Sequence, residues 1–115
     1  MGEALANFVK DLLKSVPELE INHTEHIKDN DGLLPHVFMG DVARFVLANV
    51  GKPKYDDILK RIFVCLDIGL ETNYPEVCEL IVVSFVENFQ GEEQTVKVLK
   101  PKVGPNLRLE FDKIY

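Results

Sequence analysis

The sequence predicts an all-α fold: a single domain of about five to seven helices, packed as a bundle or superhelical array around one central apolar helix. First, a chain of 115 residues is close to the commonest domain size, and 46% of it is hydrophobic. Second, apolar residues recur at spacings of three and four along most of the chain. Third, the run LIVVSFV at residues 80–86 is apolar on nearly every side, as expected of a helix that others surround. Residues 1–115 are therefore expected to form one helical domain.

The first part of the chain predicts two helices and a turn. Apolar residues at every third or fourth place predict an amphipathic helix over residues 3–16, which Pro17 ends. A short second helix is expected across residues 22–30. Asp31-Gly32 then signals a turn, because glycine readily adopts the positive φ that a chain reversal often needs.

The next helix is expected to begin at Pro35, since proline is favoured at the first helical position, and to stop at Gly51. Gly40, inside this helix, predicts a close approach of another helix or a bend, because glycine is otherwise unfavourable there. Asp41 and Arg44 are three residues apart and are expected to form an ion pair within the helix.

The second half of the chain predicts further helices. One is expected from about Tyr55 to Leu70, and another over residues 73–89 with Asn73 as its N-cap. Residues 92–100 predict a short final turn or helix. The tail GPNLRLEFDKIY alternates like a strand but also matches helical spacing. Helix is preferred for the tail, because a lone strand would have nothing to pair with.

Charge is unevenly distributed along the chain. It carries 19 acidic and 13 basic residues, a net charge of −6, and residues 1–41 alone account for −5. No basic residue lies between Arg61 and Lys97. Because affinity for nucleic acid rests on lysine and arginine, binding to DNA or RNA is not expected. A basic protein partner would suit this surface.

Neither a membrane segment nor a secretion signal is expected. No stretch approaches the length of apolar sequence that spans a bilayer, and the first residues lack a basic segment followed by an apolar one. We therefore expect a cytoplasmic protein without membrane contacts. In that compartment Cys65 and Cys78 are expected to be small buried apolar side chains, with a disulfide or a reactive thiol as the alternative.

The segment HTEHIKDNDGLLPHVFMGD, residues 23–41, holds all three histidines and could form a metal site. His23 and His26 are three residues apart, so on a helix they share a face, and nearby carboxylates could complete a zinc or iron site. The spacing lacks the fuller HExxH pattern, and no second pair of ligands follows downstream. Neither a metal nor another cofactor is expected.

The same segment could hold a general base. His36 lies at a helix start, and Asp29 or Asp31 in the preceding turn is a more suitable partner for it than Asp41. Capping of the helix and the turn explains these residues equally well. Sequence motifs for a nucleophile are absent, so no catalytic residue is predicted.

Docking of another protein is the preferred interpretation, because no other segment of the sequence suggests an active site. A strip of carboxylates would neutralise a basic surface of a partner. The strip and a second acidic patch comprise the predicted contact residues Glu20, Glu25, His26, Asp29, Asp31, Glu76 and Glu79.

Three segments resemble a family of small, all-helical bacterial proteins: GLLPHVFMGDVARFV (32–46), FVENF (85–89) and GPNLRLEF (104–111). That family includes immunity proteins of toxin–immunity systems of the contact-dependent inhibition type. The resemblance implies a non-enzymatic protein that binds a cognate toxin, for example a basic nuclease, and neutralises it by blocking its active site. It transfers no functional residue. Separately from the resemblance, a monomer or weak dimer is expected.

Two other classes of function stay open at the level of sequence. One is a metal-binding protein or small enzyme that uses His23, His26, His36 and neighbouring carboxylates. The other is a homo-oligomeric structural protein that associates through apolar helix faces. Metal analysis of the purified protein tests the first, and light scattering tests the second.

Overall fold

The computed structural model describes residues 3–115, and every regular element within them is helical. The predicted all-α class is confirmed. The seven α-helices are α1 (Glu3–Ser15), α2 (Glu20–Asn30), α3 (Pro35–Asn49), α4 (Asp56–Glu71), α5 (Pro75–Ser84), α6 (Glu93–Leu99) and α7 (Pro105–Ile114). Four 3-10 turns connect them: η1 (Pro17–Leu19), η2 (Pro53–Tyr55), η3 (Val86–Phe89) and η4 (Lys100–Lys102). Across the described residues, no helix has both the length and the apolar character that crossing a membrane requires.

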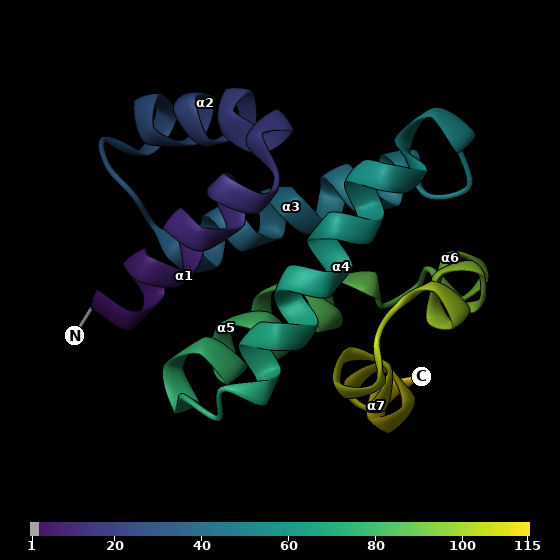
Figure 1. Ribbon diagram of the computed structural model, residues 1–115. Helices are drawn as coiled ribbons and strands as arrows, with labels where there is room; N and C mark the ends of the chain where they lie inside the picture. Colours follow the sequence, from purple (N-terminus) through teal and green to yellow (C-terminus); the bar gives the residue numbers. More distant parts are fainter. Residues whose placement is uncertain (1–2) are drawn as a thin grey trace.

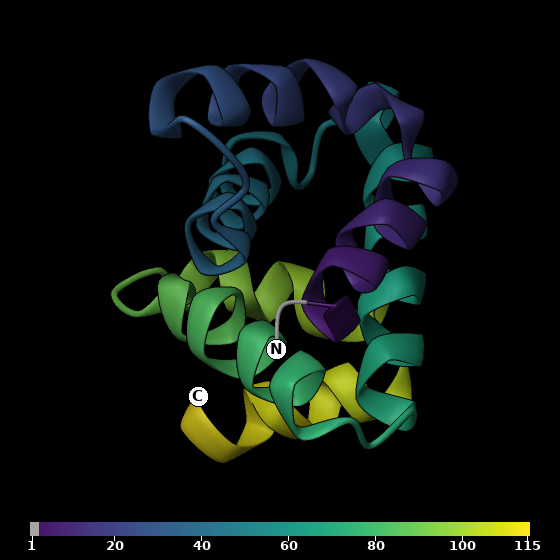
Figure 2. The same cartoon turned by 90° about the vertical axis from the view of Figure 1, so that its left-hand side faces the viewer.

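The helices form one body with extents of 35 × 30 × 24 Å. Figure 1 shows α4 running diagonally through the molecule, with α1 beside it and α3 behind it. Helix α2 lies across one end and α7 lies at the opposite end, as both Figure 1 and Figure 2 show. Figure 1 also shows the start of α5 at the end of the molecule away from α2, so the two acidic regions of the sequence, around α2 and at the start of α5, are far apart.

The core lies where α5 packs against α1, α3 and α4, so the predicted central role of this segment is confirmed. Part of the core is an aromatic cluster. Phe85, Phe89 and Phe111 are fully buried, with ring centroids 5.1–6.3 Å apart. Tyr115 extends this cluster, and its hydroxyl donates a hydrogen bond to the Val86 carbonyl at 2.8 Å. These contacts hold α7 against η3.

The expectation of one unbroken helix over residues 73–89 is wrong, because α5 ends at Ser84 and the chain continues as the 3-10 turn η3. In a 3-10 turn, side chains three apart are eclipsed, so Val86 and Phe89 both face the core. Asn73 is not the N-cap either: it has φ 61°, and α5 begins at Pro75, whose ring favours extended backbone at the preceding residue.

Two helical glycines differ in their surroundings. A Cβ on Gly40 would meet Arg44 Nη1 at 3.6 Å and Asn88 Nδ2 at 3.7 Å, which is ordinary contact, so the prediction of close helix packing there is wrong. A Cβ on Gly69 would lie 2.7 Å from Phe8 Cε1 and 2.9 Å from Ile81 Cδ1. Gly69 is thus the glycine that lets α1, α4 and α5 approach closely.

Most local predictions agree with the structure. The Asp31-Gly32 turn is confirmed, with φ 54° and 135°, and α2 begins at Glu20, two residues earlier than expected. Pro35 and Pro105 each open a helix, and the ambiguous tail is helical.

Candidate functional site

The candidate site is a groove between α2 and α3, with a volume of about 470 Å³. We call it the α2–α3 groove. Its lining from α2 is Asn22, Glu25, His26, Asp29 and Asn30, and its lining from α3 is Val37, Asp41, Arg44, Phe45, Ala48 and Asn49. Three of the predicted contact residues therefore meet in one concave surface.

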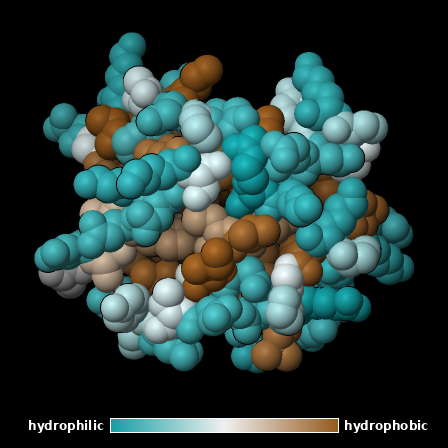
Figure 3. Space-filling model, in the orientation of Figure 1, coloured by the Kyte–Doolittle hydropathy of each residue, from teal (hydrophilic) through white to brown (hydrophobic). Residues whose placement is uncertain are grey.

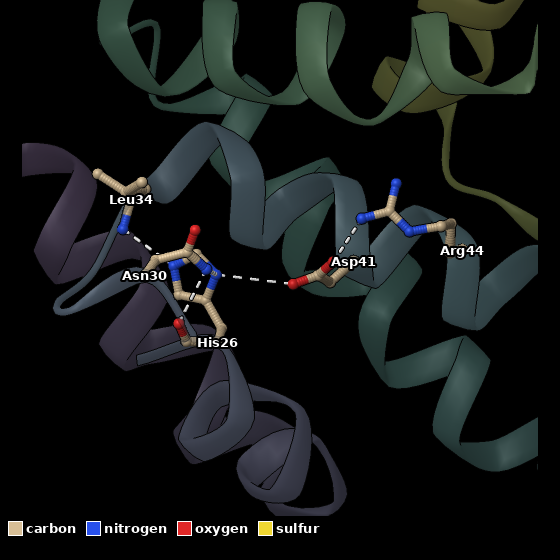
Figure 4. Close-up of polar contacts among 5 residues, drawn as sticks. All are labelled: His26, Asn30, Leu34, Asp41 and Arg44. Carbon is tan, nitrogen blue, oxygen red and sulfur yellow. Dashed lines mark hydrogen bonds and ion pairs between the residues drawn. The ribbon is translucent and has the colours of Figure 1, made fainter. Parts of the chain in front are cut away.

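His26 forms the floor of the α2–α3 groove and is only 2% exposed. The Leu34 amide donates a hydrogen bond to His26 Nε2 at 2.9 Å. Because a neutral imidazole has one acceptor nitrogen, this bond leaves the ring proton on Nδ1. Figure 4 shows that Nδ1 side turned toward Asp41, whose Oδ2 is 3.6 Å away. His26 thus links the end of α2, the loop before α3 and the carboxylate on α3.

Asn30 completes this arrangement from the last turn of α2. Its Nδ2 donates to the His26 carbonyl at 2.9 Å and lies 3.2 Å from His26 Nδ1. Since Nδ1 carries the proton, the second contact joins two donors and is not a hydrogen bond. Within residues 3–115, the acceptor found on the side of this Nδ1 donor is then the Asp41 carboxylate, at 3.6 Å.

Both histidines of α2 pack on the same aromatic ring. The ring centroids of His23 and His26 lie 5.4 and 5.6 Å from that of Phe38 on α3. The expected shared face of the two histidines is confirmed, but it is directed into the helix interface. The side chain of His26 is therefore almost fully buried below the groove, and its role in contacting a partner stays a prediction.

The rim of the α2–α3 groove is acidic. Glu25 and Asp29 are exposed, stand one turn apart on α2, and have no ion-pair partner within residues 3–115. Asp41, on the other wall, pairs with Arg44, as predicted. The groove therefore has three carboxylates and a single guanidinium in its lining.

The other predicted residues of the acidic strip lie outside this groove. Glu20 lines a separate cavity on the α1 side of α2, beside Lys10 and Lys14. Asp31 is the left-handed residue that ends α2, so its main role is in the turn. The expected continuous strip is thus divided, because α2 begins at Glu20 and turns these carboxylates to different sides.

Glu76 and Glu79 are exposed on the first turns of α5, at the end of the molecule away from α2 (Figure 1). Glu76 lines a cavity of about 460 Å³ together with Glu3, Asp11 and Tyr74. Glu76 and Glu79 therefore lie on a surface separate from the α2–α3 groove, and their role as contact residues stays a prediction.

His36 does not pair with Asp29 or Asp31. Its Nδ1 lies 2.5 Å from Ser84 Oγ, because the first turn of α3 packs against the end of α5. Ser84 is 7% exposed, and neither residue lines any of the cavities described for this structure. The His36–Ser84 pair ties two helices together.

Geometry for a metal site is likewise missing from the described part of the chain, where no three histidine, cysteine or carboxylate side chains converge. Cys65 and Cys78 are free thiols that are partly buried and pack against the core, as expected of small apolar side chains. Burial, with a smaller effect of Asp11, raises the pKa of Cys65 to about 11, so its reactive thiolate is disfavoured at neutral pH.

Sequence reasoning missed the α3 wall of the groove. Asp41, Phe45 and Asn49 follow one another at intervals of four, which places them on one helix face. That spacing was the available signal. It could not show that α2 would lie opposite.

The fold and the groove define a small all-helical domain with an acidic, histidine-floored surface cleft. Residues 9–115 match the family described as a domain of unknown function, DUF7674, and the chain belongs to that family. Comparison with the curated proteins and with the solved structures finds no match.

Proposed function

We propose that the protein is a non-enzymatic protein-binding module that receives a basic partner in the α2–α3 groove. The observation that carries the proposal is the pair Glu25 and Asp29, two exposed carboxylates on the groove rim without an ion pair in residues 3–115. Like charges four residues apart on a helix repel each other, by a few tenths of a kcal/mol. A lysine or arginine of a partner placed between them would remove that repulsion.

The rest of the groove supports a peptide-like partner. The side-chain amides of Asn22 and Asn49 lie along the walls, and the partly exposed Asp41 carboxylate lies on the α3 side. Such groups match the carbonyl and amide groups of a polypeptide as well as its basic side chain. The imidazole of His26 in the groove floor is held by the hydrogen bond from the Leu34 amide to its Nε2 and by packing on Phe38. A side chain held in this way loses less entropy on binding.

We further propose that the partner is a toxin protein, most simply a basic nuclease, and that binding blocks the toxin's active site. The resemblance to immunity proteins and the net charge of −6 support this partner class. Opposite net charges would accelerate association, and added salt would slow it.

The test is a binding measurement between the purified chain and the product of the gene beside its own, by calorimetry at low and high salt. Binding that weakens with salt is expected. Replacing both rim carboxylates, Glu25→Gln with Asp29→Asn, is expected to weaken it at least about tenfold, the equivalent of 1.4 kcal/mol. Inhibition of the partner's nuclease activity should fall in the same proportion.

The matched control is Glu76→Gln with Glu79→Gln, which removes the same charge at the other acidic patch. Unchanged binding is expected for it. If the control pair weakens binding and the rim pair does not, the α2–α3 groove is not the contact site. If neither the chain nor its variants bind or inhibit the neighbouring protein, the immunity role is refuted.

A further inference from the structure

Two segments that are far apart in the sequence concentrate the basic residues of the chain. Residues 52–60 and 97–108 together hold seven basic and two acidic residues, a net charge of +5. Because the whole chain carries −6, its remaining residues carry −11. The molecule is therefore electrically polarised, with two basic segments in an otherwise acidic chain.

The two basic segments meet around a groove of about 280 Å³. Its lining is Asp56, Leu59, Lys60 and Phe63 of α4 and Lys102 of η4. The Lys102 ammonium lies 4.0 Å from Asp56 Oδ1, which places η4 beside the first turn of α4. We call this groove, together with Lys52 and Lys54 in the turn that leads into α4, the lysine face. Figure 3, in the orientation of Figure 1, shows mainly hydrophilic residues at the upper right of the molecule, where α4 begins.

Three of the four lysines on this face have charges without a partner. Lys52, Lys54 and Lys60 are exposed and form no ion pair within residues 3–115. The Lys54 ammonium lies over the ring of Tyr55, 5.5 Å from its centroid, which holds this charge next to the start of α4. Positive charges gathered on one face repel one another. Carboxylates of a partner would relieve that repulsion and are attracted to this face.

The floor of the groove is apolar. Leu59 and Phe63 lie one turn apart on α4 and close the groove from below. Both side chains belong to the core, where they are 3% and 2% exposed. An apolar side chain of a partner would cover what remains accessible of them, together with the aliphatic stems of the lysines. The lysine face thus matches a ligand that combines carboxylates with an apolar side chain.

A short acidic segment suits this face better than a nucleic acid does. At physiological ionic strength charges are screened over about 8 Å, whereas the molecule extends over 35 × 30 × 24 Å. A short segment is therefore attracted by the lysines alone, but a nucleic acid strand would continue over acidic surface and be repelled. Bases would also lack a ring to stack on at this face, because Tyr55 lies under Lys54 and packs edge-on against Phe45.

We propose that the lysine face binds an acidic segment of a partner protein. An apolar side chain of that segment sits over Leu59 and Phe63, and the carboxylates on either side of it pair with Lys54 and Lys60. Exposed ion pairs each contribute little, so the binding is weak and depends on salt.

The test is an NMR titration of the isotope-labelled chain with the synthetic peptide acetyl-GEDEFEDEG-amide. Backbone amide signals of η2, of the first turns of α4 and of η4 should shift, and added salt should reduce the affinity. The peptide acetyl-GKKKFKKKG-amide, of equal length and opposite charge, should leave these signals in place. Serine in place of phenylalanine in the acidic peptide should weaken binding, because the apolar floor then has no partner.

Variants of the chain locate the site. Lys54→Gln with Lys60→Gln should weaken binding of the acidic peptide by about fivefold or more. The matched control is Lys10→Gln with Lys14→Gln, which removes the same charge from two exposed lysines on the side of α1 that faces α2. The control should bind the peptide nearly as the parent protein does. Circular dichroism checks that both double variants fold.

Each of four binding results would overturn the proposal: no shift at millimolar acidic peptide, equal losses in the two lysine double variants, equal affinity for the serine peptide, or tighter binding of single-stranded oligothymidine. The last result would mean that the face recognises phosphates. The same shifts on raising the concentration of the chain alone would overturn it too, because the occupant would then be a second copy. None of these results touches the α2–α3 groove, since the two surfaces share no residue.

Discussion

The two ends of the molecule are attached to its middle by different kinds of contact. Helix α2 buries one residue of its own, His26, and is held by the hydrogen bond from the Leu34 amide to His26 Nε2 and by packing on Phe38. Helix α7 is held by the aromatic cluster that Phe111 forms with Phe85 and Phe89. A directional bond to one buried imidazole positions the groove-forming end, whereas a larger buried aromatic cluster secures the other end. Single substitutions should therefore act locally at α2 and globally at α7.

The largest expected effect is at the aromatic end. Phe111→Ala removes a fully buried ring and leaves a cavity among Phe85, Phe89 and Tyr115. We expect a loss of about 3–5 kcal/mol in the free energy of unfolding. Urea denaturation followed by circular dichroism measures it. A loss below about 1 kcal/mol would mean that α7 is not part of the core.

The next effect is at the polar end. His26→Leu removes the acceptor of the Leu34 amide and should lower stability by about 1–3 kcal/mol. Hydrogen exchange should accelerate mainly in α2 and in the loop to α3. The control is His23→Leu, since His23 also packs on Phe38 but makes only a 4.0 Å contact, with Glu20. Equal effects of the two changes would contradict the role given to His26.

A pair of glycine substitutions tests close packing in the middle. Gly69→Ala should destabilise the protein by about 1–3 kcal/mol, because the new Cβ would overlap Phe8 and Ile81. Gly40→Ala, whose new Cβ would make only ordinary contacts, should instead stabilise α3 by up to about 1 kcal/mol. Thermal denaturation of both variants shows whether each substitution raises or lowers the stability of the protein. The reverse order would show that the tight contact lies at Gly40.

The smallest effect concerns the exposed pair that joins η1 to α4. The Arg61 guanidinium, by hydrogen bonding, lowers the pKa of Glu18 from 4.5 to about 2. A carboxyl group whose pKa is lower in the folded protein than in the unfolded chain stabilises the fold at pH values above its unfolded pKa. That stabilisation is lost as the pH falls toward 2. Glu18→Gln should therefore differ from the parent protein at pH 6 and converge with it near pH 2.

A double-mutant cycle isolates this pair. The coupling between Glu18→Gln and Arg61→Gln, measured from urea midpoints, should vanish over the same pH range. Arg61 also binds Asp57 and the Ser15 carbonyl, and the cycle removes those contributions. A coupling that did not change between pH 6 and pH 2 would contradict the ion pair.

Much of the fold follows from local signals in the sequence. Prolines at the first helical position mark the starts of α3 and α7, and a left-handed aspartate followed by glycine marks the end of α2. The errors fell where packing overrides local preference. The segment after Ser84 tightens into a 3-10 turn because Val86 and Phe89 must both reach the core.

The candidate site was less predictable than the fold. Glu20 and Glu25 look like neighbours in one acidic strip, yet five residues correspond to about 140° around a helix. Once α2 starts at Glu20, the two carboxylates face different sides. His26 carries no apolar signal that marks it as buried, and only the Leu34 amide and Phe38 explain why it lies inside.

The sequence by itself determined the all-α class, the starts of α3 and α7 and the acidic front of the chain, because these depend on residue spacing and composition. Tertiary structure alone decided which of those acids share a surface. It did so through the turn at Asp31-Gly32, which lays α2 beside α3 and leaves Glu25 and Asp29 facing an open groove. Contacts between residues far apart in the chain, such as that of His36 with Ser84, follow from packing geometry that no local pattern encodes.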